Sequence, residues 1–343
     1  MSEEHTHTGI AFENERTSLA QRYSEAPPAL APEPRAAFLV AHDRLSALAE
    51  AARGPALAVV AIDARARVVD ASLVPDRSAL VIGRHTYCGL RLPRARVALR
   101  QMAVLARQED GKMHAHVWDL RTEQPFTIED GGQVSAVVAD GPLYLAVDEY
   151  AMWVVPVDLV KRLPGRASDA WDALPKRSLS DRRYPGEPPP MDERTGPARP
   201  AMTGSGAAPA RTALDEITHV TTQPAPVLVG DDPGAGLGWG SLTLSSGNEQ
   251  ITYAVSADRL ARGILVGRYE RCGLRIGPLG RVSRVHVLVV RIGDEVWAID
   301  AASSNGVRRG SKEVSAVVLG SPDQVVLADV LTVGWRKTLF PDA

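Results

Sequence analysis

The chain is poor in cysteine and aromatic residues, has no long apolar run and has no excess of one charge. Its 343 residues carry a formal net charge of -2, which gives no global field that would draw it to nucleic acid or an anionic membrane. No apolar stretch approaches the roughly 20 residues that span a bilayer. The opening residues, MSEEHTHTGI, lack the basic, apolar and small segments of a signal peptide. We therefore expect a cytoplasmic protein without a membrane span, whose recognition of any anion is local.

The scarcity of cysteine excludes a disulfide framework. The two cysteines, Cys88 and Cys272, lie in the near-identical strings CGLRL and CGLRI. Equivalent positions of two copies normally point into two separate cores, so we expect reduced, buried thiols. Redox or zinc chemistry at these thiols is the weaker alternative under the spacing rules for metal sites, and we predict no cofactor.

Catalytic motifs are missing as well. We find no Walker-type phosphate loop, no metal-ligand spacing and no Ser-His-Asp order. His114 and His116 alternate in KMHAHVWD, which predicts that both lie on one face of a strand. A water-exposed sheet face is the favoured interpretation there, and a metal site is the alternative. The sequence does not indicate an enzyme.

What the chain does contain is an internal duplication. Residues 81–107 align without a gap with residues 265–291 at a constant shift of 184, pairing Gly83 with Gly267 and Arg107 with Arg291. The string VSAVV then recurs at positions 134 and 314, a shift of 180. The second copy has therefore lost a few residues in a loop, and the chain consists of two related units.

Within each copy, apolar residues alternate or form short runs broken by Gly, Pro, Asp and Asn, which is typical of strands joined by turns. We predict an all-β protein of two antiparallel β-sandwiches, each of roughly 100 residues. The predicted division of the chain is a disordered tail over 1–32, a helix over 33–53, sandwiches over 55–159 and 237–343, and a disordered Pro/Gly/Ala-rich linker over 160–236.

Three short motifs in the second copy supply donors suited to a phosphate monoester. Arg268 follows the strand that ends at Gly267, so its planar guanidinium emerges at a strand end, where it can hold two phosphate oxygens. Ser283 offers a hydroxyl, and Arg284 adds a second cation beside it. Asn305 both donates and accepts, which suits pairing with the main chain of an extended peptide.

The order of these motifs resembles the forkhead-associated (FHA) domain, a phosphothreonine-binding β-sandwich with Gly-Arg, then Ser-x-x-His, then Asn-Gly. The resemblance covers the whole second copy and implies that Arg268, Ser283 and Arg284 hold the phosphate. It implies that Ser304 and Asn305 hold the peptide backbone.

Three further residues match structural positions of that family: Gly267, His286 and Gly306. The resemblance implies that His286 bonds between loops and holds their shape, so we do not expect it to act as a catalytic base. The segment after Gly306 is one residue shorter than the usual family pattern. This difference affects the expected geometry of the loop and not the expected phosphate contacts. A purely structural alternative for Arg268 is an ion pair with Glu270.

Other cations lie near these motifs: Arg271, Arg308, Arg309 and Lys312. They would extend the positive surface toward acidic residues flanking the ligand. The favoured alternative is solvated surface charge, because exposed pairs contribute only about 0–1 kcal/mol.

The first copy keeps Arg84 after Gly83 but departs from the pattern elsewhere. Under the ungapped alignment, Leu99 replaces Ser283, Arg100 matches Arg284, Met102 replaces His286, and Gln124-Pro125 falls near Asn305-Gly306. We therefore predict a degenerate FHA-like sandwich, retained for packing, dimerisation or recognition of something unphosphorylated. Phosphate binding through Arg84 and Arg100 alone is the weaker alternative, since two arginines without oriented neutral donors give attraction without specificity.

The predicted linker carries a threonine cluster after two acids, in ALDEITHVTTQP. This is similar to the segments that precede some bacterial FHA regulators and are phosphorylated by serine/threonine kinases. Phosphorylation of Thr218, Thr221 or Thr222 would then supply an intramolecular ligand that competes with external partners.

Taken together, the motifs predict an adaptor that binds phosphothreonine proteins, such as a serine/threonine kinase or its substrates, through the second copy. The alternative is an assembly scaffold whose two sandwiches hold protein partners without dependence on phosphate.

Overall fold

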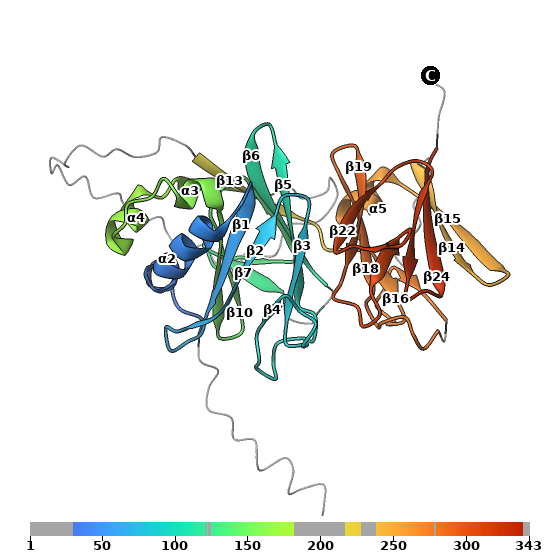
Figure 1. Cartoon of the computed structure of the whole chain (residues 1–343), viewed down its shortest axis with the longest axis horizontal. Helices are drawn as coiled ribbons and strands as arrows, with labels where there is room; N and C mark the ends of the chain where they lie inside the picture. The colour runs from blue at the N-terminus through green and yellow to red at the C-terminus, as the bar shows by residue number, and fades with distance from the viewer. Residues whose placement is uncertain are drawn as a thin grey trace, which may run out of the picture.

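The computed structural model describes residues 30–120, 122, 125–181, 217–227, 238–277 and 279–338. Strands dominate these residues, and their four sheets form two β-sandwiches that lie side by side (Figure 1). The predicted all-β fold is confirmed. The predicted N-terminal tail, apart from its last three residues, lies outside the described residues, as does the middle of the predicted linker.

The first sandwich is preceded by one helix and followed by two short ones. The helices are α2 (Pro34–Ala51), α3 (Val157–Val160) and α4 (Ala167–Ala173). The strands are β1 (Ala56–Ile62), β2 (Val68–Pro75), β3 (Ala79–Gly83), β4 (Leu90–Arg91), β5 (Met102–Glu109), β6 (Lys112–Asp119), β7 (Phe126–Ile128), β8 (Gln133–Val134), β9 (Ala136–Ala139), β10 (Leu143–Val147), β11 (Tyr150–Pro156), β12 (Lys176–Asp181) and β13 (Ile217–Gln223).

The second sandwich contains one short helix, α5 (Ala257–Arg262). Its strands are β14 (Gly240–Ser246), β15 (Glu249–Val255), β16 (Ile264–Gly267), β17 (Leu274–Arg275), β18 (Val287–Ile292), β19 (Glu295–Asp300), β20 (Val307–Arg309), β21 (Lys312–Glu313), β22 (Ala316–Leu319), β23 (Asp323–Leu327) and β24 (Leu331–Lys337).

Sheet order repeats from one copy to the other. One sheet of the first copy runs β2-β1-β11-β10-β7-β8, and its counterpart runs β15-β14-β24-β23-β20-β21. The other sheet runs β9-β6-β5-β3-β4 against β22-β19-β18-β16-β17, with β12 and β13 added only to the first copy. Most pairs are antiparallel, whereas β3–β4, β16–β17 and β12–β13 are parallel. The duplication seen in the sequence is therefore a duplication of strand order.

Helix α2 covers the outer face of the first copy's β1–β11–β10 sheet. Phe38 and Leu45 of the helix are buried against Val60 and Trp153 of the sheet, and the Phe38 and Trp153 rings meet edge to face at 5.4 Å. Both faces of this sheet are therefore buried, which explains why β1 reads as the unbroken apolar run ALAVVAI. None of the described helices is long and apolar enough to cross a membrane.

Two parts of the predicted linker, 160–181 and 217–227, contain ordered structure. Helices α3 and α4 pack with α2, and β12 and β13 extend the first copy's sheet beyond β9. Assigning the whole of 160–236 to a tether was therefore wrong. Short strands of this kind are stabilised by pairing with a strand that is distant in the sequence. Their local composition therefore does not predict that they form strands.

The two sandwiches pack against each other through equivalent sheet faces. A buried apolar cluster joins the outer face of the β6–β5–β3 layer to that of the β19–β18–β16 layer. It includes Leu105 and Trp118 from the first copy and Leu288, Val290 and Trp297 from the second. Burial of this cluster favours one fixed arrangement of the two copies, since apolar surface removed from water contributes about 25 cal/mol per Å².

Polar contacts flank this interdomain cluster. Glu295 of the second copy lies 3.2 Å from the Arg107 guanidinium and 3.7 Å from that of Arg77. Arg100 of the first copy donates from Nε and Nη2 to the Ala302 carbonyl of the second copy, at 3.0 and 2.8 Å. Ala302 belongs to the loop that carries Ser304 and Asn305, so the first copy directly supports a loop of the candidate site.

Cys88 and Cys272 both lie in the interdomain cluster and are free and buried. The expectation that they point into two separate cores was wrong, because the duplicated face became the interface. Burial raises the pKa of Cys88 to about 11 and that of Cys272 to about 12. Both thiols are therefore protonated near neutral pH and poorly nucleophilic.

Candidate functional site

The candidate site begins where β16 ends. Gly267 packs so closely against the next loop that a Cβ there would lie 2.2 Å from the Arg284 carbonyl oxygen. Only glycine permits this approach. The backbone N–H of Arg268 donates to the Ser283 carbonyl at 3.2 Å, and that of Tyr269 donates to the Arg284 carbonyl at 2.8 Å. The Gly-Arg and Ser-Arg motifs are thereby joined along their backbones.

The Arg268 side chain is exposed but held in direction. Its Nε donates to the Val282 carbonyl at 2.5 Å, which leaves the two terminal nitrogens directed elsewhere. No ion pair between Arg268 and Glu270, or any other carboxylate, occurs within the described part of the chain. The structural alternative for Arg268 therefore has no support in this geometry.

His286 joins the loops from beneath. It is fully buried, its Nδ1 accepts from the Ser283 N–H at 3.0 Å, and its Nε2 donates to the Gly306 carbonyl at 3.0 Å. Burial lowers the pKa of His286, which favours the neutral ring that these two bonds require. The residue occupies a bracing position, with no outward-facing nitrogen for acid–base chemistry.

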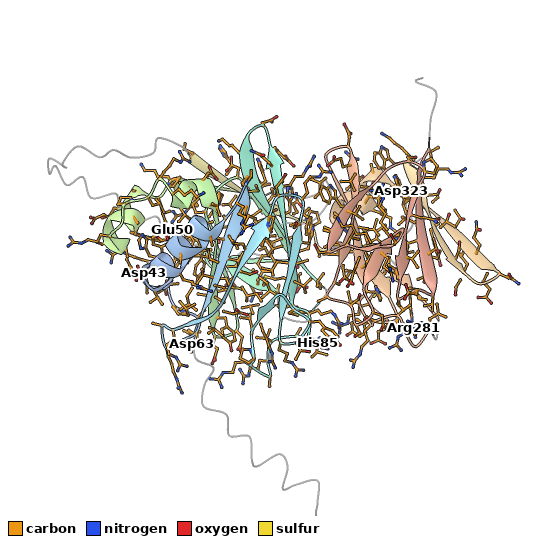
Figure 2. All side chains as sticks on the ribbon, viewed as in Figure 1. Asp43, Glu50, Asp63, His85, Arg281 and Asp323 are labelled. Atoms are coloured by element: carbon orange, nitrogen blue, oxygen red, sulfur yellow. The ribbon has the colours of Figure 1, made fainter. Side chains whose placement is uncertain are left out.

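Ser304 and Asn305 lie on the loop after β19 and are exposed. The Ser304 N–H donates to the Ser283 hydroxyl oxygen at 3.0 Å. Asn305 donates from Nδ2 to the Arg281 carbonyl at 2.6 Å. Figure 2 places Arg281 at the lower end of the second sandwich, so the motif loops meet at this rim.

Gly306 completes the loop with a left-handed backbone, at φ 72°. This conformation favours glycine, whereas the nearest atom to a Cβ there, at 2.9 Å, belongs to the flexible Glu313 side chain, which can move aside. Its carbonyl accepts from His286 and from the Ala328 N–H, the latter at 3.1 Å.

The remaining cations lie in three different settings. Arg308 lies 3.7 Å from Asp329, and Arg309 donates to Asp323 at 2.5 Å, so both are at least partly neutralised within the protein. Arg271 and Arg284 line a cleft between the two sandwiches. Lys312 is exposed on β21. These cations therefore do not form the continuous positive surface that was predicted, and Arg271 and Arg284 face the first copy.

A test of the brace uses glutamine and alanine at position 286. We expect His286→Ala to destabilise the chain by about 1–3 kcal/mol, since it leaves the buried Ser283 N–H and Gly306 carbonyl without partners. His286→Gln is expected to recover most of this loss, because a carboxamide can accept and donate in the same two directions. Urea unfolding followed by tryptophan fluorescence measures the difference; equal loss in both variants would contradict the bracing role.

Beyond β4 and β17, the two copies correspond at a shift of 185 residues and not at the predicted 184. Ile82 lies opposite Met102, whereas its counterpart Val266 lies opposite Val287. The second copy has one extra residue between Ile276 and Leu279, in the loop that follows β17. The ungapped assignments of Leu99 to Ser283, Arg100 to Arg284 and Met102 to His286 were therefore wrong.

Backbone hydrogen bonds give the corrected equivalences. The Arg84 N–H donates to the Ala98 carbonyl at 3.0 Å, as that of Arg268 donates to the Ser283 carbonyl. Arg84 also repeats the bond from Nε, to the Val97 carbonyl at 2.9 Å. The corrected pairs are Ser283 with Ala98, Arg284 with Leu99, Val285 with Arg100, and His286 with Gln101. The first copy thus keeps its arginine but lacks the hydroxyl and the second cation of the loop.

Gln101 takes over the bracing role in the first copy. Its Oε1 accepts from the Ala98 N–H at 3.1 Å, and its Nε2 donates to the Thr122 hydroxyl at 2.7 Å. The predicted replacement of the histidine by Met102, which would leave the first copy without this brace, was wrong, because the correct counterpart is a glutamine of similar reach. The neighbouring Gln124 lies outside the described residues.

Comparisons with known proteins find no matching family model and no matching curated protein. Solved structures do match. The Rv1747 FHA-1 domain of Mycobacterium tuberculosis is 22% identical, with 29% of this chain and 98% of that chain covered and a TM-score of 0.25. An FHA domain of Arabidopsis thaliana is 21% identical, with 33% and 99% covered and a TM-score of 0.26. The CT664 FHA domain of Chlamydia trachomatis is 10% identical, with 29% and 96% covered and a TM-score of 0.25.

The solved structures that this chain resembles are FHA domains. Each likeness spans about the length of one sandwich. Identities and TM-scores this low carry no information about the ligand, which has to be inferred from the loops of this chain.

The predicted phosphorylation sites lie in a strand of the first sandwich. Thr218, Thr221 and Thr222 belong to β13, which pairs with β12 on one side and β9 on the other. Thr218 is 2% exposed, and the Thr221 hydroxyl lies 3.0 Å from that of Ser180. Their placement in a disordered linker was wrong, so an intramolecular ligand from this segment would require β13 to leave its sheet.

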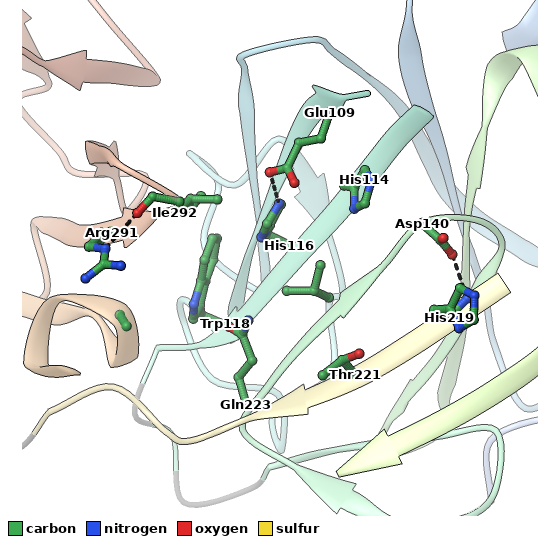
Figure 3. A pocket seen from close by; sticks show the side chains of 13 residues that line it. Glu109, His114, His116, Trp118, Asp140, His219, Thr221, Gln223, Arg291 and Ile292 are labelled. Atoms are coloured by element: carbon green, nitrogen blue, oxygen red, sulfur yellow. Dashed lines mark hydrogen bonds and ion pairs between the residues drawn. The ribbon is translucent and has the colours of Figure 1, made fainter. Parts of the chain in front are cut away.

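The histidines of β6 line a pocket of about 380 Å³ beside the second sandwich (Figure 3). His114 and His116 stack on one strand face, 6.3 Å apart. His116 is only 4% exposed, so a water-exposed face was the wrong expectation for it, and it lines the pocket together with Ile292 of the second copy. His219 lies across the pocket beside Asp140. Over the described ranges, no three potential ligands are arranged to hold a metal ion.

Proposed function

We propose that the chain is an adaptor that binds phosphothreonine peptides through its C-terminal sandwich, in serine/threonine kinase signalling. The observation that carries this proposal is the convergence of three loops on one rim. Arg268, Ser283 and Asn305 come from different loops, and backbone and side-chain hydrogen bonds connect these loops.

The charge of the rim suits a phosphate monoester. Phosphothreonine carries about -1.5 to -2 charges near neutral pH. Arg268 presents its terminal nitrogens from a fixed direction, because the Val282 carbonyl holds its Nε. The Ser283 hydroxyl accepts from Ser304 and keeps its own proton for a phosphate oxygen. Arg284, exposed beside it, supplies the second positive charge.

Asn305 is suited to reading the peptide backbone. Its Nδ2 is engaged by the Arg281 carbonyl, which fixes the orientation of the carboxamide. The Oδ1 is then directed away from that bond and can accept an N–H from an extended ligand. A peptide held in this way is recognised by its main chain as well as by its phosphate.

A peptide library tests the proposal on the full chain. Each sequence is presented with phosphothreonine, phosphoserine or unmodified threonine, and binding is measured by fluorescence anisotropy. We expect saturable binding that requires the phosphate. Binding that is equal for phosphorylated and unmodified peptides, or absent throughout, would contradict the proposal.

The scaffold alternative is favoured by one observation, the apolar packing of the first copy against the second. A chain built mainly to hold partners together would use such rigid docking without reading phosphate. Pull-downs before and after phosphatase treatment of the partners separate the two functions: the adaptor loses its partners and the scaffold keeps them.

A further inference from the structure

The interdomain contact leaves a cleft whose lining is rich in arginine. It encloses about 430 Å³ and is lined from the first copy by Arg84, Arg96 and Arg100 and from the second by Arg271 and Arg284, together with seven neutral residues. No aspartate or glutamate is among the described residues that line it. The cleft exists only where the two sandwiches are docked, because neither supplies the lining alone.

Burial disfavours the charged form of Arg100 in this cleft. Its side chain is half-buried, and its Nε and Nη2 donate to the neutral Ala302 carbonyl. Burial lowers the pKa of Arg100, and the nearby Arg284 guanidinium acts in the same direction. Asp300 opposes this shift, yet no hydrogen bond joins its carboxylate to Arg100. A half-buried guanidinium near a second cation is stabilised by an anion that enters from solvent.

The cleft adjoins the rim of the second copy. Arg284 lines the cleft, and its neighbour Ser283 belongs to the loop junction that holds Ser304. Arg84 enters from the other side and is the first copy's counterpart of Arg268, with its Nε fixed by the Val97 carbonyl. The arginine that the degenerate first copy has kept therefore faces the cleft.

We propose that this interdomain cleft is a second anion site, which binds a phosphate monoester at Arg84, with the Arg284 guanidinium at the border shared between the cleft and the Arg268 rim. Its small volume suits one phosphorylated side chain better than a nucleic acid, and the net charge of -2 gives no field for a polyanion. The phosphate can come from a second phosphorylated residue of a peptide bound at the Arg268 rim or from free phosphate. Only the first source rests on the proposed function.

Inorganic phosphate tests the cleft independently of the rim. The full chain carrying Arg268→Ala is titrated at constant ionic strength, and the arginine Nε–H signals are followed by NMR. We expect saturable shifts of the Arg84 and Arg284 signals that additional Arg84→Gln abolishes. Arg65→Gln, at an exposed arginine of the β1–β2 turn that does not line the cleft, is the matched control and should change nothing. Absence of saturable shifts, or shifts that survive Arg84→Gln, would overturn the proposal.

Peptides then identify the source of the phosphate. A singly phosphorylated peptide is compared with versions carrying a second phosphate at increasing spacing. If the peptide is the source, one spacing gains about tenfold or more in affinity, and Arg84→Gln removes this gain while leaving the singly phosphorylated peptide unaffected. If no spacing gains affinity while inorganic phosphate still binds, the cleft takes free phosphate. Loss of peptide binding with retained phosphate binding would reject the rim function and keep the cleft.

Discussion

Replacing Arg268 by alanine is expected to weaken binding of a singly phosphorylated threonine peptide by about 10- to 150-fold. A hydrogen bond to a charged group contributes about 1.5–3 kcal/mol, and Arg268 presents its guanidinium from a position fixed by Val282. Isothermal titration calorimetry on the full chain measures the change. The fold should survive, because the side chain is exposed.

The chain provides its own matched control for this experiment. Arg84→Ala removes an arginine with the same backbone setting and the same Nε bond to the preceding loop. For a singly phosphorylated peptide we expect its affinity to equal that of the unaltered chain. If the two substitutions had equal effects, the ligand would be responding to overall charge and not to the rim of the second copy.

Introducing a carboxylate at the interdomain cluster is expected to separate the two sandwiches. Leu288 is fully buried on the outer face of β18, and an unpaired charge there costs several kcal/mol. In a separated second sandwich the same aspartate would face water, so Leu288→Asp should undock the copies and leave each folded.

The buried thiols report this separation. Cys88 and Cys272 lie in the same cluster, and their raised pKa values of about 11 and about 12 make them slow to react at pH 8. In Leu288→Asp both should react rapidly with a disulfide reagent, while Gln250→Asp on the exposed edge strand β15 should leave them protected. Thiols that stay protected in Leu288→Asp would contradict the docked arrangement.

The fold was largely predictable because the duplication repeats both the apolar pattern and the turn residues. Two signals of additional packing were also in the sequence. Strand β1 is apolar at every position, whereas its counterpart β14 alternates as GSLTLSS. The runs in β5 and β18 are similarly continuous. A strand that is apolar on both faces needs a second covering layer, which proved to be α2 for β1 and the opposite sandwich for β5 and β18.

The candidate site was predictable where a motif fixes local geometry and not where a contact is distant. Gly267, His286 and Gly306 take positions that their neighbours require within one loop cluster. The bracing role of Gln101 was not predicted, because one extra residue in a loop of the second copy shifted the alignment and paired Met102 with His286. The sequence also gives no sign that a carboxamide can make the hydrogen bonds of an imidazole. The contact that Arg100 makes was not predicted, because its partner, the Ala302 carbonyl, lies in the other copy.

The bond from Arg100 to Ala302 also changes what counts as the recognition unit. A fragment limited to the C-terminal sandwich would retain every motif residue, yet it would expose Leu288 and Trp297 to water and release the loop before Ser304 from its outside support. The first copy, which lacks the serine hydroxyl, thus supports the site loop of the second copy. Substitutions on the interdomain face of the first copy are therefore expected to change ligand binding at the Arg268 rim, although that rim belongs to the second copy.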